Sequence, residues 1–595
     1  MKIRLGKEQD VVKYISKHKE GISIIILMLS VFLILFLAFD FKDYNISMPF
    51  VYNGGDDFLV YKNAKMVTSD DSWIFETERL GAPYGGEYYD FMADSLQNVD
   101  NFLLKIVGIF VKDPVIIYNC VILFLFFAIA LIAYYVLRKI GVRNDFAIMG
   151  ALTFDFSYYH FFRMMGHFCL SCYEFVPLSV LLCVWLWKDE KLFCFGKSFF
   201  GYKKNYVVIL LLFLMANNGI AYYPFFTCMF LGITALSKSI KEKKKAPILK
   251  MFSMVCLCGF FLLLALAPSF VYQMKNGMNL VSRNIWDTEQ YALKIIQLLV
   301  PYKSHGIEKL ETFQKEYYSF FTYTEAVSSY LGLIAGIGFL LLVLGLFLPK
   351  VRVKGKESVF ILLVELNVFA ILFATMGGFS SVFANFVTEI LRGANRISIF
   401  IMFFAVAAVG ILMTKLMALN NKGKKHKFVC CTIYWVFLGA VVWGLWDQIP
   451  QNLTGNSAAF MAEKQSDQNF IERIEDELPD NAMIYQLPYH IYPEGGPVNS
   501  MADYHLLIGY LYSDNLRWSY GGSKGRESDL WNQFVGSQTP DVIVSMVKEK
   551  GFAGIYIDKR AYTDEEFNNL IVTLNACIGH EPISSENGNL YFYKF

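Results

Sequence analysis

Long runs of apolar residues constrain this chain more than any other feature of its sequence. Crossing a bilayer as a helix takes about 20 apolar residues, and about eleven segments of the 595-residue chain come close to that requirement. They cover residues 22–39, 114–137, 145–160, 173–187, 205–217, 219–236, 250–272, 327–348, 358–376, 396–417 and 427–446. The "MANNGIAYYP" stretch is compatible with one broken or re-entrant element, because Gly219 and Pro224 interrupt it. With 55% hydrophobic and 18% charged residues, the chain is predicted to be a polytopic α-helical membrane protein.

Basic residues predict how the chain is oriented, because loops rich in Lys and Arg stay in the cytoplasm. The basic stretches are residues 2–19 and the loops "LRKIGVR", "FGYKKN", "SKSIKEKKK", "PKVRVKGKE" and "NNKGKKHK". All of them fall on the cytoplasmic side when the N-terminus is inside. We therefore expect a multi-pass protein of the plasma membrane whose loops 40–113 and 273–326 and whose C-terminal region face outward.

The composition changes after about residue 446. Residues 1–446 form the predicted transmembrane domain, and residues 447–595 have the mixed composition of a soluble domain. There "AMIYQLPY", "DVIVSMVKEKGFAGIYID" and "NLYFYKF" suggest short strands, with amphipathic helices at "DQNFIERIEDEL" and "TDEEFNNLIVTLNAC". The sequence thus predicts a small extracytoplasmic α/β domain. Segments 94–110 and 288–299 have the apolar spacing of helices that lie in the outer interface.

Several classes of function find no support in the chain. The formal net charge is only +2, which offers no argument for nucleic acid as a partner. The sequence contains neither a phosphate-binding glycine loop ending in Lys-Ser/Thr nor a dinucleotide fingerprint. Because most cells have no sugar nucleotides outside, an outward-facing transferase would need a donor carried across the bilayer on a lipid phosphate.

An acidic pair, Asp56 and Asp57, follows two glycines in the first outer loop, and Tyr61 lies four residues after the second acid. In an extended stretch, adjacent side chains point to opposite sides, so one carboxylate would aim into a cavity. Such a carboxylate can take a proton from a hydroxyl nucleophile or share a divalent ion. The alternative is a turn with two solvated acids.

Two groups of cationic residues also lie at predicted span ends. His160, Arg163 and His167 are spaced three and four apart, which on one helix would place them along one face for phosphate, substrate or metal contact. Arg392 and Arg396, at the outward start of a span, suit a phosphate. The alternatives are ordinary polar caps for the histidines and snorkelling to lipid headgroups for the arginines.

The stretch "GAPYGGEYYDFMADS" places Glu87, Asp90 and Asp94 among tyrosines. Aromatic rings beside carboxylates are typical of a sugar-binding groove. A tyrosine belt at the membrane interface has the same pattern. Both interpretations stay open at this point.

Taken together, the early acidic loop, interfacial helices, many spans and outward C-terminal domain resemble the GT-C superfamily of polyprenyl-phosphate-sugar glycosyltransferases. The stretches "LGAPYGGEYYDF", "DSLQNVDNFLLKIVGIFVKDP", "YYHFFRMMGHFCLSCYEFVPLSVLL", "EAVSSYLGL" and "RGANR" resemble more narrowly a bacterial, YfhO-like branch of large membrane proteins. The C-terminal domain matches in general style only, with "GFAGIYIDKRAY" as its most familiar phrase. The resemblance implies a GT-C-like transmembrane domain over residues 1–446.

The resemblance also implies an inverting sugar transfer to a cell-envelope acceptor, which is a glycan, a teichoic acid or a lipid. The family's first-loop acid, a catalytic base or an organiser of the acceptor, maps onto Asp56 or Asp57. Arg392 and Arg396 become the candidates for the lipid phosphate, with the two histidines and Arg163 as helpers. Some members use a divalent ion, so Mg or Mn stays open as a cofactor, although the sequence offers no clear ligand set.

Two other functions stay open. A transporter or flippase of lipid-linked sugars would share the spans and arginines but would carry polar groups near the middle of its helices. A non-catalytic envelope-assembly protein would use its outer domain to bind a partner. The charged residues gather at the outer edge, with Asp155 and Glu365 as the main exceptions, which favours the enzyme.

Overall fold

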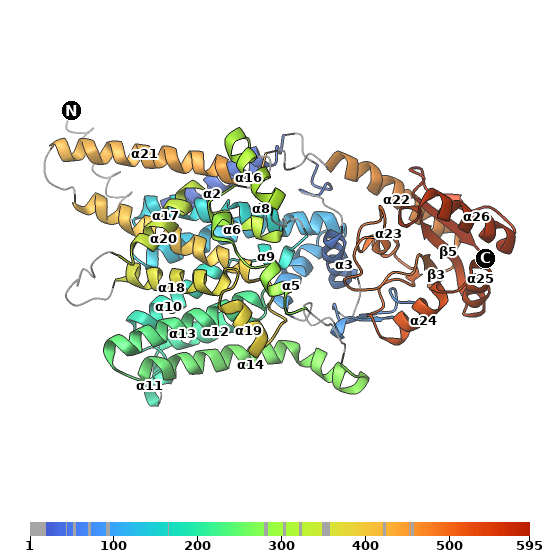
Figure 1. The fold of residues 1–595 in the computed structure, drawn as a ribbon, viewed down its shortest axis with the longest axis horizontal. Coiled ribbons are helices and arrows are strands. Elements are labelled where there is room, and N and C mark those ends of the chain that lie inside the picture. The colour runs from blue at the N-terminus through green and yellow to red at the C-terminus, as the bar shows by residue number, and fades with distance from the viewer. Residues whose placement is uncertain are drawn as a thin grey trace, which may run out of the picture.

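The computed structural model shows an elongated molecule, with a bundle of helices at one end and a mixed α/β domain at the other (Figure 1). The described chain begins at Lys19 in the bundle and ends at Phe595 in the C-terminal domain. The structure describes residues 19–42, 45–50, 55–69, 73–90, 96–164, 166–194, 196–219, 221–278, 284–301, 305–320, 324–347, 358–419, 424–451, 453 and 457–595.

Each predicted apolar span coincides with a helix of the bundle. These helices are α2 (Lys19–Ala38), α6 (Pro114–Lys139), α7 (Asn144–Asp155), α10 (Val176–Lys188), α12 (Lys203–Ala216), α13 (Tyr222–Glu242), α14 (Ala246–Asn276), α17 (Gly332–Leu344), α18 (Val359–Ala374), α20 (Ser398–Leu419) and α21 (Lys424–Gln448). Within the described residues, five helical segments are long and apolar enough to cross a membrane, and three more are apolar but shorter. The chain is a multi-pass helical membrane protein, whereas the span count of about eleven stays a prediction.

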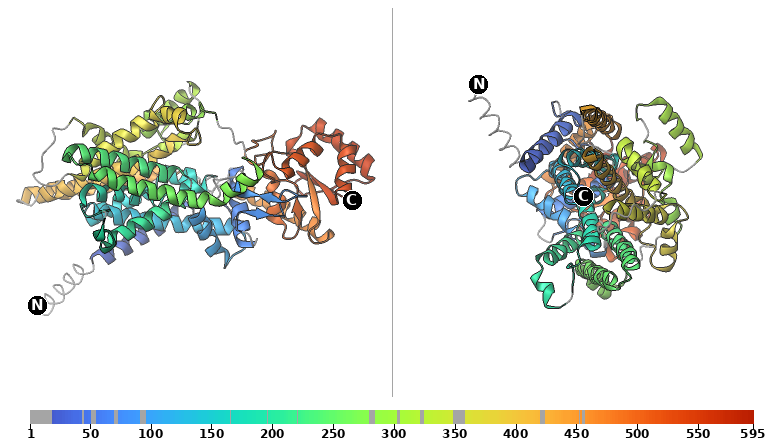
Figure 2. Two further views of the ribbon diagram at one scale, coloured as in Figure 1. Left: turned by 90° about the horizontal axis from the view of Figure 1, so that it is seen from below. Right: turned by 90° about the vertical axis from the view of Figure 1, so that its left-hand side faces the viewer.

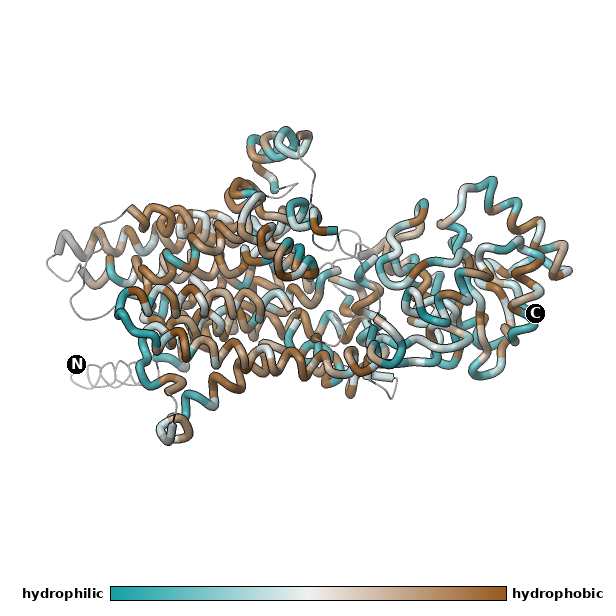
Figure 3. Tube along the Cα trace, turned by 60° about the horizontal axis from the view of Figure 1, so that its bottom comes forward, coloured by the Kyte–Doolittle hydropathy of each residue, from teal (hydrophilic) through white to brown (hydrophobic). Residues whose placement is uncertain are grey.

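Burial differs sharply among these helices. The apolar window of the α20 segment is 83% buried, while those of α14 and α21 are 17% and 11% buried. The apolar surfaces of the outer helices give the bundle its hydrophobic exterior in Figure 3, which suits contact with lipid. Seen along the long axis, the bundle helices surround a packed centre (Figure 2). Gly338 of α17 is required there, because a Cβ would lie 2.4 Å from the backbone oxygen of Ala405 in α20.

The break between α12 and α13 confirms that the "MANNGIAYYP" stretch interrupts a helix. It is held by α5 (Asn98–Gly108), where the Asp100 carboxylate accepts a hydrogen bond of 2.7 Å from the Gly219 amide. The helix predicted over 94–110 is thereby confirmed in its central part. The helix predicted over 288–299 is wrong as one element, since the chain forms only α15 (Asp287–Gln290) and a 3₁₀ turn, η2 (Ile295–Leu298).

Shorter elements occupy the end of the bundle next to the C-terminal domain. The helices there are α3 (Asp56–Ser69), α8 (Tyr158–Arg163), α9 (Phe168–Ser171), α16 (Glu308–Phe320) and α19 (Phe379–Phe386), and α11 (Lys197–Gly201) lies at the opposite end. The 3₁₀ turns are η1 (Tyr88–Asp90), η3 (Glu325–Ser329) and η4 (Ala394–Ile397), and the strands β1 (Glu76–Thr77) and β2 (Gly86–Glu87) pair antiparallel.

The C-terminal region folds around a five-stranded mixed sheet in the order β4-β3-β5-β7-β6. Its strands are β3 (Met483–Leu487), β4 (Arg517–Trp518), β5 (Phe552–Asp558), β6 (Ile583–Ser584) and β7 (Leu590–Lys594). Its helices are α22 (Ser457–Glu477), α23 (Ile508–Tyr512), α24 (Glu527–Gly536), α25 (Pro540–Glu549) and α26 (Asp564–Ile578), with the 3₁₀ turns η5 (His505–Leu507) and η6 (Lys559–Ala561). The strand predicted over 541–558 is wrong in its first half, where a proline-started amphipathic helix, α25, buries Ile543 and Val547.

The first loop binds the C-terminal domain to the bundle. Arg526 of the loop before α24 pairs with the buried Asp90, with a contact of 2.7 Å from Nη2 to Oδ1, and also donates to the backbone oxygens of Asn276 and Gly277 at the end of α14. Lys62 of α3 donates to the Tyr492 hydroxyl at 3.0 Å. At Arg526, the first loop, the end of α14 and the segment before α24 therefore meet, although they are far apart in sequence.

We expect Arg526→Ala to destabilise the docking of the C-terminal domain. Asp90 would remain buried without a counter-charge, at a cost of about 3 kcal/mol. The apparent melting temperature of purified protein in detergent should fall, and the double variant Asp90→Asn with Arg526→Ala should recover part of the loss. The exposed Arg473→Ala variant serves as the control. Equal melting temperatures for the single and double variants would contradict this explanation.

Candidate active site

The acidic pair lies in the first turn of α3. The expectation of an extended stretch with side chains on opposite sides is therefore wrong, because the helix begins at Asp56 itself. A helix N-terminus favours carboxylates through its unpaired amides and its dipole. The Asp56 side chain is 47% exposed, whereas Asp57 is buried. Gly166 packs directly against both acids, and its positive φ of 93° favours glycine there; a Cβ would make a tight contact of 3.2 Å with the Cβ of Asp56.

His167 connects the acidic pair to the bundle. Its Nε2 atom lies 3.9 Å from Oδ2 of Asp56 and 3.8 Å from Oε2 of Glu325. His160, Arg163 and His167 do not share a helix face, because α8 ends at Arg163 and the chain turns before α9. Of the two histidines, this turn brings only His167 to the acids.

Glu325, at the start of η3, is the central residue of the cluster. Its carboxylate accepts hydrogen bonds from Arg163 at 2.6 Å, from Asn395 at 3.0 Å and from Arg396 at 3.2 Å. Arg163 also donates to the side-chain oxygen of Asn395 at 2.9 Å. Because Arg163 is wholly buried, its charge depends on this acid. Sequence reasoning missed Glu325, although the stretch "EAVSSYLGL" contains it and an acid at a span start is a usable signal.

The surroundings set the protonation of these groups. Burial, then the nearby charges of Asp503, Glu494 and Glu325, raise the pKa of Asp56 to about 6. Burial and the positive charge of Arg163 lower the pKa of His167, so this ring is neutral at pH 7. Arg163 and Arg396 outweigh burial at Glu325 and hold the pKa of its carboxyl well below the ordinary value. A carboxylate that titrates near neutral pH thus faces a neutral imidazole and a charged acid–arginine cluster.

Two acids near Asp56 come from the C-terminal domain and were not predicted. Asp503 and Glu494 belong to the irregular segment between β3 and η5, and the backbone oxygen of Asp503 lies about 4.0 Å from where a Cβ of Gly55 would be. Asp503 accepts a hydrogen bond of 3.0 Å from the backbone amide of Tyr504, and His490 lies 3.4 Å from it. The C-terminal domain therefore contributes to the electrostatics of the first-loop acids.

Arg392 and Arg396 precede α20 and take different partners. Arg392 pairs with Asp287 at 2.6 Å and its side chain is 30% exposed. Arg396, 13% exposed, lies over the ring of Tyr222 at 4.4 Å from its centroid and pairs with Glu325. The expected pair of guanidinium groups at a helix N-terminus is thus split between two carboxylates.

Three other predicted residues lie away from the cluster of Asp56, His167 and Glu325, and a fourth lies outside the described residues. His160 is fully buried, stacked on Phe126 with ring centroids 4.0 Å apart, and its Nδ1 lies 3.0 Å from the Asp155 backbone oxygen. Glu87 lines a separate cavity of about 350 Å³, and Asp90 forms the Arg526 contact. Asp94 lies outside the described residues.

Tyr61 lies on α3 one turn after Asp57 and is buried. Its ring packs edge-on against Tyr118 at 5.8 Å. The Tyr118 hydroxyl in turn donates to the backbone oxygen of Met164, close to the turn that carries His167. Tyr61 therefore supports the surroundings of the acids.

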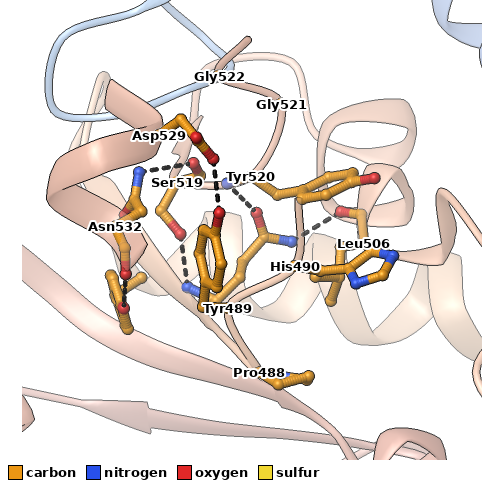
Figure 4. A pocket seen from close by; sticks show the side chains of 12 residues that line it. Pro488, Tyr489, His490, Leu506, Ser519, Tyr520, Gly521, Gly522, Asp529 and Asn532 are labelled. Carbon is orange, nitrogen blue, oxygen red and sulfur yellow. Dashed lines mark hydrogen bonds between the residues drawn. The ribbon is translucent and has the colours of Figure 1, made fainter. Parts of the chain in front are cut away.

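A pocket in the C-terminal domain is too small for a substrate. Tyr489, His490, Tyr520, Asp529 and their neighbours surround a volume of about 10 Å³, and the Tyr489 hydroxyl points to the Asp529 carboxylate (Figure 4). That volume is on the order of one water molecule. The pocket therefore does not compete with the Asp56 cluster as the candidate site.

No group of three or more His, Cys, Asp or Glu side chains among the described residues has an arrangement that could hold a metal ion. The Asp56, His167 and Glu325 side chains meet at distances of 3.8 and 3.9 Å, with two arginines on the far side. These residues do not fit the oxygen-rich shell of Mg or Mn. No chemical step is therefore assigned to a divalent cation.

No family model and no curated protein matches the chain, but solved structures do. The arabinofuranosyltransferase AftD from Mycobacteria is 10% identical over 96% of this chain and 41% of its own, with a TM-score of 0.51. The oligosaccharyltransferase AglB from Archaeoglobus fulgidus, in complex with an inhibitory peptide and a dolichol-phosphate, is 11% identical over 97% of this chain and 75% of its own, with a TM-score of 0.44. ArnT from Cupriavidus metallidurans, bound to undecaprenyl phosphate, is 8% identical over 96% and 97%, with a TM-score of 0.49.

These neighbours are glycosyltransferases of the GT-C superfamily, so the predicted resemblance is confirmed for the fold. The chain spans less than half the length of AftD. A further structure of the archaeal oligosaccharyltransferase contains Zn and sulfate. The narrower resemblance to the YfhO-like branch stays a prediction.

Glu325→Ala should destabilise the protein, because the buried Arg163 and the nearby Arg396 lose their shared counter-charge. Breaking a buried ion pair from one side costs about 3 kcal/mol or more. Thermal unfolding in detergent should show a clear loss for Glu325→Ala and a smaller one for Glu325→Gln, which keeps one acceptor oxygen. The exposed Glu316→Ala variant on α16 is the control. A melting temperature for Glu325→Ala equal to that of the control would show that the cluster does not depend on this acid.

Proposed function

We propose that this protein is a membrane glycosyltransferase that moves a sugar from a polyprenyl-phosphate donor to a cell-envelope acceptor on the extracytoplasmic face. One observation carries the proposal. A carboxylate from the first loop and guanidinium groups from distant parts of the chain converge on His167, which lies within 4 Å of both Asp56 and the Glu325 that binds Arg163 and Arg396. Sugar transfer from a lipid phosphate requires these two chemistries side by side.

Asp56 is the proposed base. The acceptor hydroxyl would attack the anomeric carbon and give its proton to Asp56, while the bond from that carbon to the phosphate oxygen breaks and the polyprenyl phosphate leaves. A base works best when its pKa lies near the working pH, and Asp56 has a pKa of about 6. Its side chain is about half exposed, whereas Asp57 is buried beside Gly166. Asp57 would therefore shape the turn.

The arginines would stabilise the negative charge on the departing phosphate. Among Arg163, Arg392 and Arg396, the most exposed side chain is that of Arg392. A phosphate oxygen could replace the Asp287 carboxylate as its partner. Arg396 would act from the adjacent turn, while the fully buried Arg163 would hold Glu325 and Asn395 in place. His167, neutral at pH 7, would lie between base and phosphate as a hydrogen-bonding group. His160 has no part in the proposal.

The described basic stretches 137–143, 200–205 and 237–245 lie at the end of the bundle away from the C-terminal domain, which supports a location of the site on the outer face. Binding of dolichol-phosphate by AglB and of undecaprenyl phosphate by ArnT supports a lipid-linked donor by analogy. The mid-bundle acid Glu365 is engaged by Lys241 at 2.6 Å and by Ser237 at 2.5 Å. This pairing gives no specific support to a transport pathway.

We expect Asp56→Asn to reduce sugar transfer at least about 100-fold, because the acceptor hydroxyl would lose its proton acceptor. The measurement is the envelope glycan profile of a deletion strain that expresses each variant, with protein levels in the membrane checked. Asp57→Asn should cause a smaller loss, and the exposed Asp564→Asn should cause none. Full transfer by Asp56→Asn would remove the base from the proposal.

The rate of transfer should fall as the pH drops through about 6, because protonated Asp56 cannot accept a proton. Asp503→Asn removes a negative charge that raises this pKa, so the acidic limb should move to lower pH by about half a unit. The exposed Asp476→Asn should leave the profile unchanged. A shift to higher pH in Asp503→Asn would contradict the assigned electrostatics.

A further inference from the structure

A cleft of about 600 Å³ lies between the bundle and the C-terminal domain. Its lining includes neither the Asp56 cluster nor the contact between Asp90 and Arg526. α3 and the start of α6 form one wall, with Tyr61, Lys65 and Asp113. α22 and α23 form the other, with Gln468 and Tyr512. Its volume falls within the range of about 300–1,000 Å³ that is usual for ligand sites.

The cleft follows the face of α3 that begins at Asp57, the buried acid of the pair. Asp57, Tyr61, Lys65 and Thr68 are spaced four, four and three residues apart on α3, so they share one face. The last three of them line the cleft. Residues one turn apart on a helix are about 6 Å apart at their Cβ atoms. The inner end of the cleft at Tyr61 is therefore about one turn from Asp57, the residue that follows Asp56.

The charges that line the cleft balance. Four cationic residues, Lys65, Arg79, Lys112 and Lys464, are matched by four acids, Asp113, Glu472, Glu475 and Asp514. Lys464 pairs with Asp113 at 2.7 Å, and Lys65 contacts Asp514 at 3.2 Å. Paired charges of both signs give an anionic ligand no net attraction. They leave the exposed carboxylates of Glu472 and Asp514 as hydrogen-bond acceptors for a neutral ligand.

Hydroxyl groups suit such a lining, because each both donates and accepts hydrogen bonds. The Lys65 ammonium already donates to Leu511, Ser513 and Asp514, and the Gln468 amide to Glu472. Ligand hydroxyls would therefore donate mainly to the remaining lone pairs of the carboxylates. The half-buried ring of Tyr512 offers an apolar face against which the C–H face of a sugar ring can pack, and the buried Tyr61 closes the inner end of the cleft. The lining therefore matches a neutral polyhydroxylated ligand.

We propose that the cleft binds a neutral oligosaccharide, which is the glycan portion of the acceptor. Its terminal sugar would point along α3 toward Asp56, so that one hydroxyl reaches the base. This inference rests on the proposed function and narrows it. Of the acceptor classes open so far, it selects a neutral glycan over a phosphate-rich teichoic acid or a lipid.

The test is glycan binding by the full-length protein in detergent, on an array of neutral gluco-, galacto-, manno- and arabino-oligosaccharides of three and four units, with sulfated ones of the same length. We expect binding of at least one neutral series, and at least tenfold weaker binding by Gln468→Trp, which fills the cleft from α22. Gln465→Trp, on the exposed side of the same helix, is the matched control. Glu472→Trp is a second blocking variant should Gln468→Trp unfold.

Three outcomes would overturn the inference: no binding of any neutral oligosaccharide, stronger binding of the sulfated ones, or unchanged binding by both blocking variants. Asp56→Asn separates this inference from the proposed function, since it should bind the same glycan as the wild type while failing to transfer sugar. Full transfer by Asp56→Asn would defeat the transferase proposal, whatever the cleft binds. If Asp56→Asn loses transfer and the wild type binds no neutral glycan, the proposal for the cleft is wrong and the transferase proposal stands.

Discussion

The arrangement at the end of the bundle depends on the neutralisation of buried guanidinium charge by one carboxylate. Arg163 is fully enclosed, and an unpaired charge in such a place is too costly to persist. The Glu325 carboxylate neutralises this charge, and it accepts hydrogen bonds from Arg163, Arg396 and Asn395. Because these partners come from α8 and η4 while Glu325 belongs to η3, their mutual attraction fixes three separate chain segments. The position of His167, and through it the relation to Asp56, follows from that fixed cluster.

The bundle itself was largely predictable from the sequence. Runs of apolar residues have few alternatives to a helix where backbone groups cannot reach water, and each predicted run coincides with a helix. The errors arose where the local pattern is ambiguous. "DVIVSMVKEK" is rich in β-branched residues, yet Pro540 at its start and its apolar spacing make it a helix that packs on the sheet. The segment 288–299 has helical spacing, but it is interrupted by the bridge between Leu293 and Thr375.

The candidate site was predictable only in part, and the reason is the same for several residues. Charge at span ends pointed to Asp56, Arg163, His167 and Arg396, which the structure brings together. Spacing alone could not show that the chain turns after Arg163, which leaves His160 in the core. Nor could a single sequence show which acids neutralise which arginines, since Glu325 and the two acids of the C-terminal domain are distant along the chain. For Asp90, the sequence left a sugar-binding groove and a tyrosine belt open, and it could not show that this acid is buried against Arg526, which is distant along the chain.

α3 has one further consequence for how such a molecule would work. Its lysines are bonded to the C-terminal domain, with Lys62 on Tyr492 and Lys65 on the backbone oxygens of Leu511 and Ser513. The arginine cluster is built by the bundle alone. α3 is also held by the bundle, because Gly166 packs against both acids and Tyr61 packs against Tyr118 of α6. The helix that carries the carboxylate is therefore shared by the two bodies, so a displacement of the outer domain would act on α3 against its contacts with the bundle.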